Sequence, residues 1–135
     1  MSGDTGDDVL SGEAGHDDIR GHEGNDTLSG GDGDDMIRGL AGDDSLSGDD
    51  GNDFVRGNGG DDTVNGGRGA DTLLGDVGDD VLSGNRDRDQ LDGSDGHDTL
   101  VAGQDSDTLL GGNGQDHIDG GLGGDVIRSS PDGIG

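Results

Sequence analysis

Residues 21–29 read Gly21-His22-Glu23-Gly24-Asn25-Asp26-Thr27-Leu28-Ser29, a nonapeptide whose pattern returns nine residues later. The next nonapeptide, residues 30–38, again has glycine first and fourth, aspartate sixth and an aliphatic residue eighth. This register holds from Gly3 to Arg128 without an insertion or a deletion, which gives 14 consecutive units. A fixed short period is typical of solenoids, in which each repeat stacks on its neighbours.

Four positions of the unit are restricted, and the first and fourth are almost always glycine. The exceptions are Ala102 at the first position and Asp87 and Asp105 at the fourth. The eighth is always aliphatic: Leu10, Ile19, Leu28, Ile37, Leu46, Val55, Val64, Leu73, Leu82, Leu91, Leu100, Leu109, Ile118 and Ile127. The sixth is always aspartate: Asp8, Asp17, Asp26, Asp35, Asp44, Asp53, Asp62, Asp71, Asp80, Asp89, Asp98, Asp107, Asp116 and Asp125. A merely solvated acidic surface would not keep aliphatic and glycine positions in the same frame, so these aspartates are candidate metal ligands.

This pattern resembles the RTX, or haemolysin-type calcium-binding, nonapeptide Gly-Gly-x-Gly-x-Asp-x-U-x. The resemblance covers nearly the whole chain, in 14 matches that keep one register. It implies an all-β fold, a parallel β-roll solenoid with two turns and two short strands in each 18-residue coil. In each unit, six residues would form a turn that holds calcium and three would form a strand.

An independent period of 18 supports two units per coil. The ninth positions of the first six units alternate between serine and arginine: Ser11, Arg20, Ser29, Arg38, Ser47 and Arg56. A coil with two strands would place the serines on one sheet and the arginines on the other. The arginine ladder is interpreted either as neutralised by nearby acids or as a ligand-binding stripe.

The residues within a unit suit this arrangement. The seventh to ninth positions would point out, in and out, as the pleat of a strand requires, so the aliphatic eighth position would face the core. Glycine at the first and fourth positions allows a positive φ or a close backbone approach. Such short strands would be stable only as a ladder of neighbours about 4.8 Å apart.

The composition predicts a chain that does not fold without a cation. It has 33 acidic residues against 7 basic ones, a formal charge of −26, 34 glycines and one aromatic residue. Such low hydrophobicity and high charge are typical of disorder, because too little apolar surface is available to offset the entropy lost on folding. A hard cation that binds the carboxylates is the natural stabiliser.

Calcium prefers six to eight oxygen ligands, which one nonapeptide cannot supply. The resemblance implies that each ion lies between turns one coil apart, pairing Asp8 with Asp26 and Asp17 with Asp35, with backbone carbonyls completing the shell. Two columns of seven turns give about twelve interior calcium sites, with possible extra half-sites at the ends. Twelve Ca²⁺ would bring +24 against the chain's −26.

Other classes of function find little support. An EF-hand is excluded because no twelve-residue loop ends in a glutamate ligand, and strong negative charge argues against nucleic acid and anionic membranes. No apolar run is long enough for a membrane span or a signal peptide.

The four histidines do not all occupy one position of the unit, so they are expected to be exposed residues rather than transition-metal ligands: His16, His22, His97 and His117. Nothing indicates an enzyme, since no serine is paired with a histidine and an aspartate in a fixed arrangement.

The expected organisation is one β-roll domain at residues 3–128 and a short tail at 129–135, where Pro131 would block further strand pairing. Local turn strain or a weakened calcium site is expected in the irregular units at residues 84–92 and 102–110. The unbroken register and the lack of bulky caps favour an excised or engineered array, with end-to-end self-association at high concentration.

The function that the resemblance implies is a calcium-binding module that is disordered without calcium and a rigid rod with it. In RTX exoproteins this behaviour accompanies type I secretion, so an extracellular location is expected, although no signal peptide is visible. The alternative is a recognition or adhesin-type spacer that binds ice or polysaccharide. Thr at the seventh position in only five units, and a single aromatic residue, disfavour that alternative.

Overall fold

The computed structural model describes residues 1–128, and within them it contains strands and turns but no helix. None of the described residues therefore forms a helix that could cross a membrane. The expected tail at residues 129–135, including Pro131, lies outside the described residues. The strands are β1 (Val9–Ser11), β2 (Asp18–Glu23), β3 (Thr27–Asp32), β4 (Met36–Ala41), β5 (Ser45–Asp50), β6 (Phe54–Gly59), β7 (Thr63–Arg68), β8 (Thr72–Val77), β9 (Val81–Arg86), β10 (Gln90–Asp95), β11 (Thr99–Gln104), β12 (Thr108–Asn113), β13 (His117–Leu122) and β14 (Val126–Arg128).

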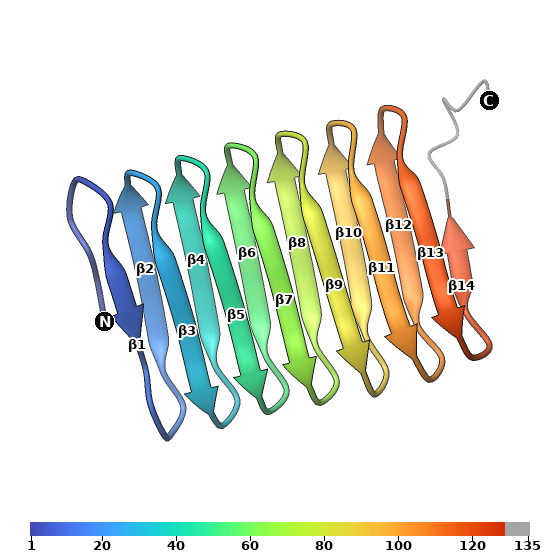
Figure 1. Ribbon diagram of the computed structural model, residues 1–135, viewed down its shortest axis with the longest axis horizontal. Coiled ribbons are helices and arrows are strands. Elements are labelled where there is room, and N and C mark those ends of the chain that lie inside the picture. The colour runs from blue at the N-terminus through green and yellow to red at the C-terminus, as the bar shows by residue number, and fades with distance from the viewer. Residues whose placement is uncertain (129–135) are drawn as a thin grey trace.

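The strands form two parallel seven-stranded sheets (Figure 1). One sheet has the order β1-β3-β5-β7-β9-β11-β13, and the other contains the even-numbered strands from β14 to β2. Each strand pairs with the strand one coil away, so that Leu28 lies beside Leu46 and Ile37 beside Val55. The predicted β-roll with two strands per 18-residue coil is confirmed.

The register follows from backbone hydrogen bonds between residues in successive coils. The amide of Thr27 donates to the carbonyl of Asp8 at 2.8 Å, and that of Ser45 donates to the carbonyl of Asp26 at 2.8 Å. The same register confirms the predicted side-chain ladders. Ser29 pairs with Ser47 on one sheet, and Arg38 pairs with Arg56 on the other.

Twelve of the strands are six residues long, twice the length that the resemblance implied. Each continues from the seventh position of one unit to the third position of the next, as Thr27–Asp32 does. The first three positions of a unit also stack on their equivalents one coil away, and their backbone groups keep pairing. Only the fourth to sixth positions are left to form the turn between sheets.

The core is a double column of the aliphatic eighth positions. Leu10 and Ile118 pack against this core as partly buried residues. The buried core residues are eleven eighth-position aliphatics and the first-position Ala102: Ile19, Leu28, Ile37, Leu46, Val55, Val64, Leu73, Leu82, Leu91, Leu100, Ala102 and Leu109. Ile127 in the last coil remains 51% exposed, because no further coil covers it. The narrow core has aliphatic side chains in its centre and glycines and aspartates toward both edges.

The second position of the unit has a left-handed backbone conformation from the second unit onward, whatever its residue type. Its φ is positive from Glu13 (74°) onward, including 89° at His22 and 88° at Leu40. Side chains with a Cβ rarely adopt this left-handed region because the Cβ approaches the carbonyl oxygen. Non-glycine residues at this position therefore carry local strain.

Candidate metal centres

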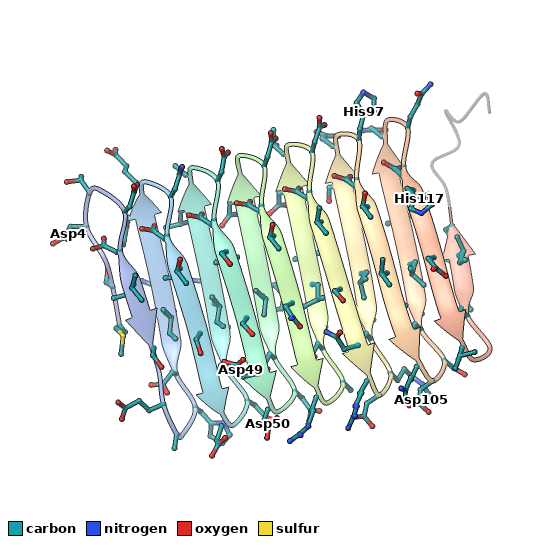
Figure 2. The ribbon with its side chains drawn as sticks, viewed as in Figure 1. Asp4, Asp49, Asp50, His97, Asp105 and His117 are labelled. Atoms are coloured by element: carbon teal, nitrogen blue, oxygen red, sulfur yellow. The ribbon has the colours of Figure 1, made fainter. Side chains whose placement is uncertain are left out.

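The sixth-position aspartates stand in two columns, one along each edge of the solenoid. With units numbered 1 to 14 from Gly3, the odd-numbered turns form one edge and the even-numbered turns the other. Figure 2 shows His97 at the odd edge and Asp105 at the even edge. Ten of the aspartates are buried, with side chains 0–4% exposed: Asp26, Asp35, Asp44, Asp53, Asp62, Asp71, Asp80, Asp89, Asp98 and Asp107. The four at the ends of the columns, Asp8, Asp17, Asp116 and Asp125, are half-buried.

A hydrogen bond between coils orients twelve of these carboxylates, all except those of Asp8 and Asp17 in the first coil. The amide of Asp26 donates to Oδ1 of Asp44 at 2.8 Å, and the amide of Asp44 donates to Oδ1 of Asp62 at 2.8 Å. The same bond recurs along both edges, from Asp8 to Asp26 on one and from Asp17 to Asp35 on the other. The structure therefore joins the aspartates in the pairs that the sequence predicts, one coil apart.

The second carboxylate oxygen has no protein partner. Oδ2 is buried and without a hydrogen bond in eleven aspartates: Asp17, Asp26, Asp35, Asp44, Asp53, Asp62, Asp71, Asp80, Asp89, Asp98 and Asp107. An ionised oxygen removed from water without a partner costs several kcal/mol, so buried charges are paired or bind metals. Two columns of such unpaired oxygens indicate that these carboxylates bind cations.

The glycine at the first position leaves space beside this oxygen. A Cβ placed on Gly21 would lie 2.2 Å from Oδ2 of Asp26 and 2.8 Å from the carbonyl oxygen of Gly39, one coil away. A carboxylate oxygen and a backbone carbonyl thus converge on the same small space. Glycine is required here by close approach and not by φ, because its φ is not positive.

Burial and mutual repulsion disfavour the charged form of these aspartates when no cation is bound. Burial raises the pKa of Asp62 to about 7, and repulsion by Asp80 and Asp44 adds to the shift. Burial likewise raises the pKa of Asp53 to about 6 and that of Asp89 to about 7. A hydrogen bond from the backbone partly opposes each shift. A divalent cation would reverse this balance, because opposite charge favours the ionised form.

Within residues 1–128, no group of three or more His, Cys, Asp or Glu side chains is placed to hold a metal ion. Any metal site along the two edges must therefore combine two carboxylates with backbone carbonyls. Such an all-oxygen set suits calcium, which accepts carbonyl ligands and irregular geometry. The residues present fit calcium better than zinc or another metal that prefers nitrogen or sulfur.

The fifth position forms a second ladder that the sequence reasoning did not anticipate. The amide of Asp61 donates to Oδ1 of Asp43 at 2.9 Å, and the amide of Asp79 donates to Oδ1 of Asp61 at 2.9 Å. Nδ1 of His97 accepts from the amide of Gln115 at 2.9 Å in the same way. The preference for Asp and Asn at this position was a signal for such a ladder. All four histidines are exposed, as predicted.

The irregular units show the predicted turn strain. Asp87 and Asp105 replace glycine in the even turns and adopt φ values of 72° and 77°. The amide of Gly69 donates to a carboxylate oxygen of Asp87 at 3.2 Å. Asp89 and Asp107 remain buried in the same turns. The fold thus tolerates both substitutions without displacing the aspartate columns.

Two of the three arginines of the ladder pair with acids, while Arg38 donates to Sδ of Met36 at 2.9 Å. Arg20 forms an ion pair with Asp18 at 2.7 Å, and Arg56 pairs with Asp76. The threonines of the seventh position are divided between the sheets, with Thr63 in β7 and Thr72 in β8. Neither sheet carries an unbroken threonine column.

The fold and its carboxylate-lined turns define a parallel β-solenoid of the metal-binding repeat class. The family model of the RTX calcium-binding nonapeptide repeat matches residues 1–28, 29–64, 56–91 and 92–127 in four copies. The chain therefore belongs to the RTX calcium-binding nonapeptide repeat family. This is a structural calcium-binding family and not a family of enzymes. A comparison with curated proteins gives no match.

Proposed function

We propose that the protein is a calcium-dependent folding module, disordered without calcium and a rigid β-roll with it. The observation that carries this proposal is the set of buried Oδ2 atoms without a protein partner along both edges. Fourteen closely stacked carboxylates destabilise one another unless a cation lies between them. Calcium would supply that charge.

All 14 sixth-position aspartates would serve as ligands, each interior one contributing to two ions. Each ion would be shared by two turns one coil apart, together with backbone carbonyls such as that of Gly39. Two columns of seven turns provide about twelve interior sites, with half-sites beyond the end aspartates.

Calcium binding and folding would then be a single event. The unfolded chain has no preformed site, so the binding free energy becomes folding free energy. Ligands shared by successive coils would make the transition cooperative, as in other linear repeat arrays.

The direct test is far-UV circular dichroism during a calcium titration from EDTA, with magnesium as the control ion. We expect a steep transition from coil to β-structure in calcium alone, because magnesium demands a stricter octahedral geometry and dehydrates reluctantly. A full β-signal in EDTA at neutral pH would contradict the proposal.

The module would act as a folding switch in an exported protein. It would stay unfolded where calcium is scarce and fold outside the cell, where calcium reaches millimolar concentrations. The support is the RTX family, whose members are typically secreted. A calcium midpoint below the micromolar range would argue against this role, because the chain would then fold before export.

The domain is proposed to comprise residues 3–128, with end-to-end association in calcium. The edge strands, β1 and β13 in one sheet and β2 and β14 in the other, each pair with a single strand, and Ile127 is 51% exposed. Open strand edges favour pairing with another chain. Sedimentation velocity over a wide concentration range tests this, and a strict monomer throughout would exclude it.

A further inference from the structure

Ala102 is the single residue other than glycine at the first position of the unit. It lies at the end of the buried part of β11 and is fully buried, with 0% exposure. Its equivalents one coil away on the same edge are Gly84 and Gly120. Every first-position residue faces the space in which a carboxylate and a carbonyl converge.

The other units show what a methyl group does at this position. A Cβ placed on any of the 13 glycines would lie 2.1–2.6 Å from Oδ2 of the aspartate in the same unit. On Gly48, for example, it would lie 2.3 Å from Oδ2 of Asp53 and 2.6 Å from the carbonyl oxygen of Gly66. Cβ atoms essentially never approach other atoms this closely, so either the carboxylate or the backbone must move.

Ala102 occupies the position equivalent to these glycines, so its methyl group is directed toward Asp107 of the same unit. Oδ2 of Asp107 is buried and has no protein partner, like those of the regular turns. The methyl group therefore takes up space beside a candidate ligand and adds no oxygen. Asp107 keeps its ladder contacts, accepting from the amide of Asp89 at 2.8 Å and donating its own amide to Oδ1 of Asp125 at 3.0 Å.

We infer that Ala102 blocks or weakens the calcium site between units 12 and 14, the last complete site of the even edge. This inference rests on the proposed calcium function and refines it. The chain then binds about eleven calcium ions tightly instead of about twelve. As the calcium concentration rises, the C-terminal end of the even edge is the last part of that edge to bind its ion and fold.

The aspartates that replace glycine at the fourth position of units 10 and 12 do not explain the loss of a calcium site. Asp87 and Asp105 also replace glycines, but each brings a carboxylate to its turn. The carboxylate of Asp87 accepts from the amide of Gly69 at 3.2 Å, so it has a backbone partner one coil away. The side chains of Asp87 and Asp105 are exposed to solvent at the fourth position, whereas the methyl group of Ala102 is fully buried at the first position.

The test is Ala102→Gly, measured by calcium stoichiometry in equilibrium dialysis and by the calcium midpoint of the dichroism transition. We expect one additional tightly bound ion per chain and about a tenfold tightening of the weakest binding step, or about 1.4 kcal/mol. Hydrogen exchange should show new protection in β12 and β14, which directly follow the two turns of the repaired site.

Three variants serve as comparisons. Gly48→Ala introduces the same methyl group in a regular even turn and should remove about one ion. Ala41→Gly makes the same change as the test at an exposed third position and should add none. Asp105→Gly restores the regular fourth position, and it should add none either.

Unchanged stoichiometry and midpoint in Ala102→Gly would overturn the inference. The same gain in Asp105→Gly would also overturn it, by assigning the weakness to the fourth position. If neither the natural chain nor any variant binds calcium, the proposed function itself fails. If all variants bind calcium equally, the proposed function stands and only the inference about Ala102 fails.

Discussion

The amide of Asp44 donates a 2.8 Å hydrogen bond to Oδ1 of Asp62, one coil further along, while Oδ2 of Asp62 is buried and unpaired. One oxygen of the carboxylate is thus used to fix the side chain, and the other remains free for a ligand. Repetition of this arrangement along both edges gives each coil the same orientation. The backbone therefore positions a charge that the protein alone does not neutralise.

Asp62→Asn should separate these two roles. The amide oxygen of asparagine can still accept from Asp44, but the NH₂ group replaces the free carboxylate oxygen. Since Asp62 would contribute to two calcium ions, we expect the calcium midpoint to rise by about tenfold or more, or at least 1.4 kcal/mol. Circular dichroism at increasing calcium measures the shift.

The neighbouring Asp61→Asn is the matched control for that substitution. Asp61 is exposed, and its Oδ1 accepts from the amide of Asp79, a role that Asn25 and Asn52 already fill at the same position. We expect a change of less than twofold in the calcium midpoint. Equal effects of the two substitutions would mean that only overall charge matters, and not ligand position.

The sequence predicted the features that repeat in residue type. Asp62 and Val64 occupy positions whose chemistry never varies, and both are buried as expected. The first-position glycines were assigned to either positive φ or close approach, and the contact with Oδ2 now selects close approach. The burial of these positions could be predicted from the sequence because the same physical requirement recurs in every coil.

Other features escaped the sequence because the backbone imposes them on varied side chains. Leu40 has a left-handed φ that its residue type does not favour. The five glycines and two asparagines at the second position of other units were a signal for this conformation. The strands are longer than expected for a related reason. Stacking aligns the backbones of the first three positions whatever side chains they carry, and pairing continues through them.

Acid should partly replace calcium as a stabiliser. Burial raises the pKa of Asp62 and Asp71 to about 7 and that of Asp44 and Asp80 to about 6, from the ordinary value of 3.8. A carboxyl whose pKa is raised on folding favours the folded state when protonated. Its contribution is complete below about pH 4 and is lost as pH rises through about 6 to 7.

The measurement is dichroism in EDTA between pH 4 and pH 8. We expect β-signal to grow as pH falls, and calcium affinity to weaken over the same range because protons compete for the carboxylates. Precipitation at low pH is monitored by light scattering. A β-signal in EDTA that increases with pH would contradict the assignment of these carboxyls as buried.

His22→Gly should stabilise the calcium-bound protein despite the usual cost of glycine. His22 is exposed and has a φ of 89°, so relief of about 1–2 kcal/mol of strain exceeds the 0.5–1 kcal/mol entropic cost. We expect a net gain of about 0.5–1 kcal/mol in urea unfolding. Glu23→Gly, at the next residue of β2, has no such strain to relieve and should destabilise the protein.

Leu73→Ala tests whether the coils fold as one unit. Leu73 is 0% exposed in the middle of the core column, and its removal should cost about 2–5 kcal/mol in the calcium-bound state. Leu74, the next residue of β8, lies half-buried on the outer face, so Leu74→Ala should cost much less. If calcium binding and folding are coupled, Leu73→Ala must also raise the calcium midpoint, although Leu73 is no ligand. A variant with a weakened core but an unchanged calcium midpoint would show that the sites form before the core, and the two processes would then be separable.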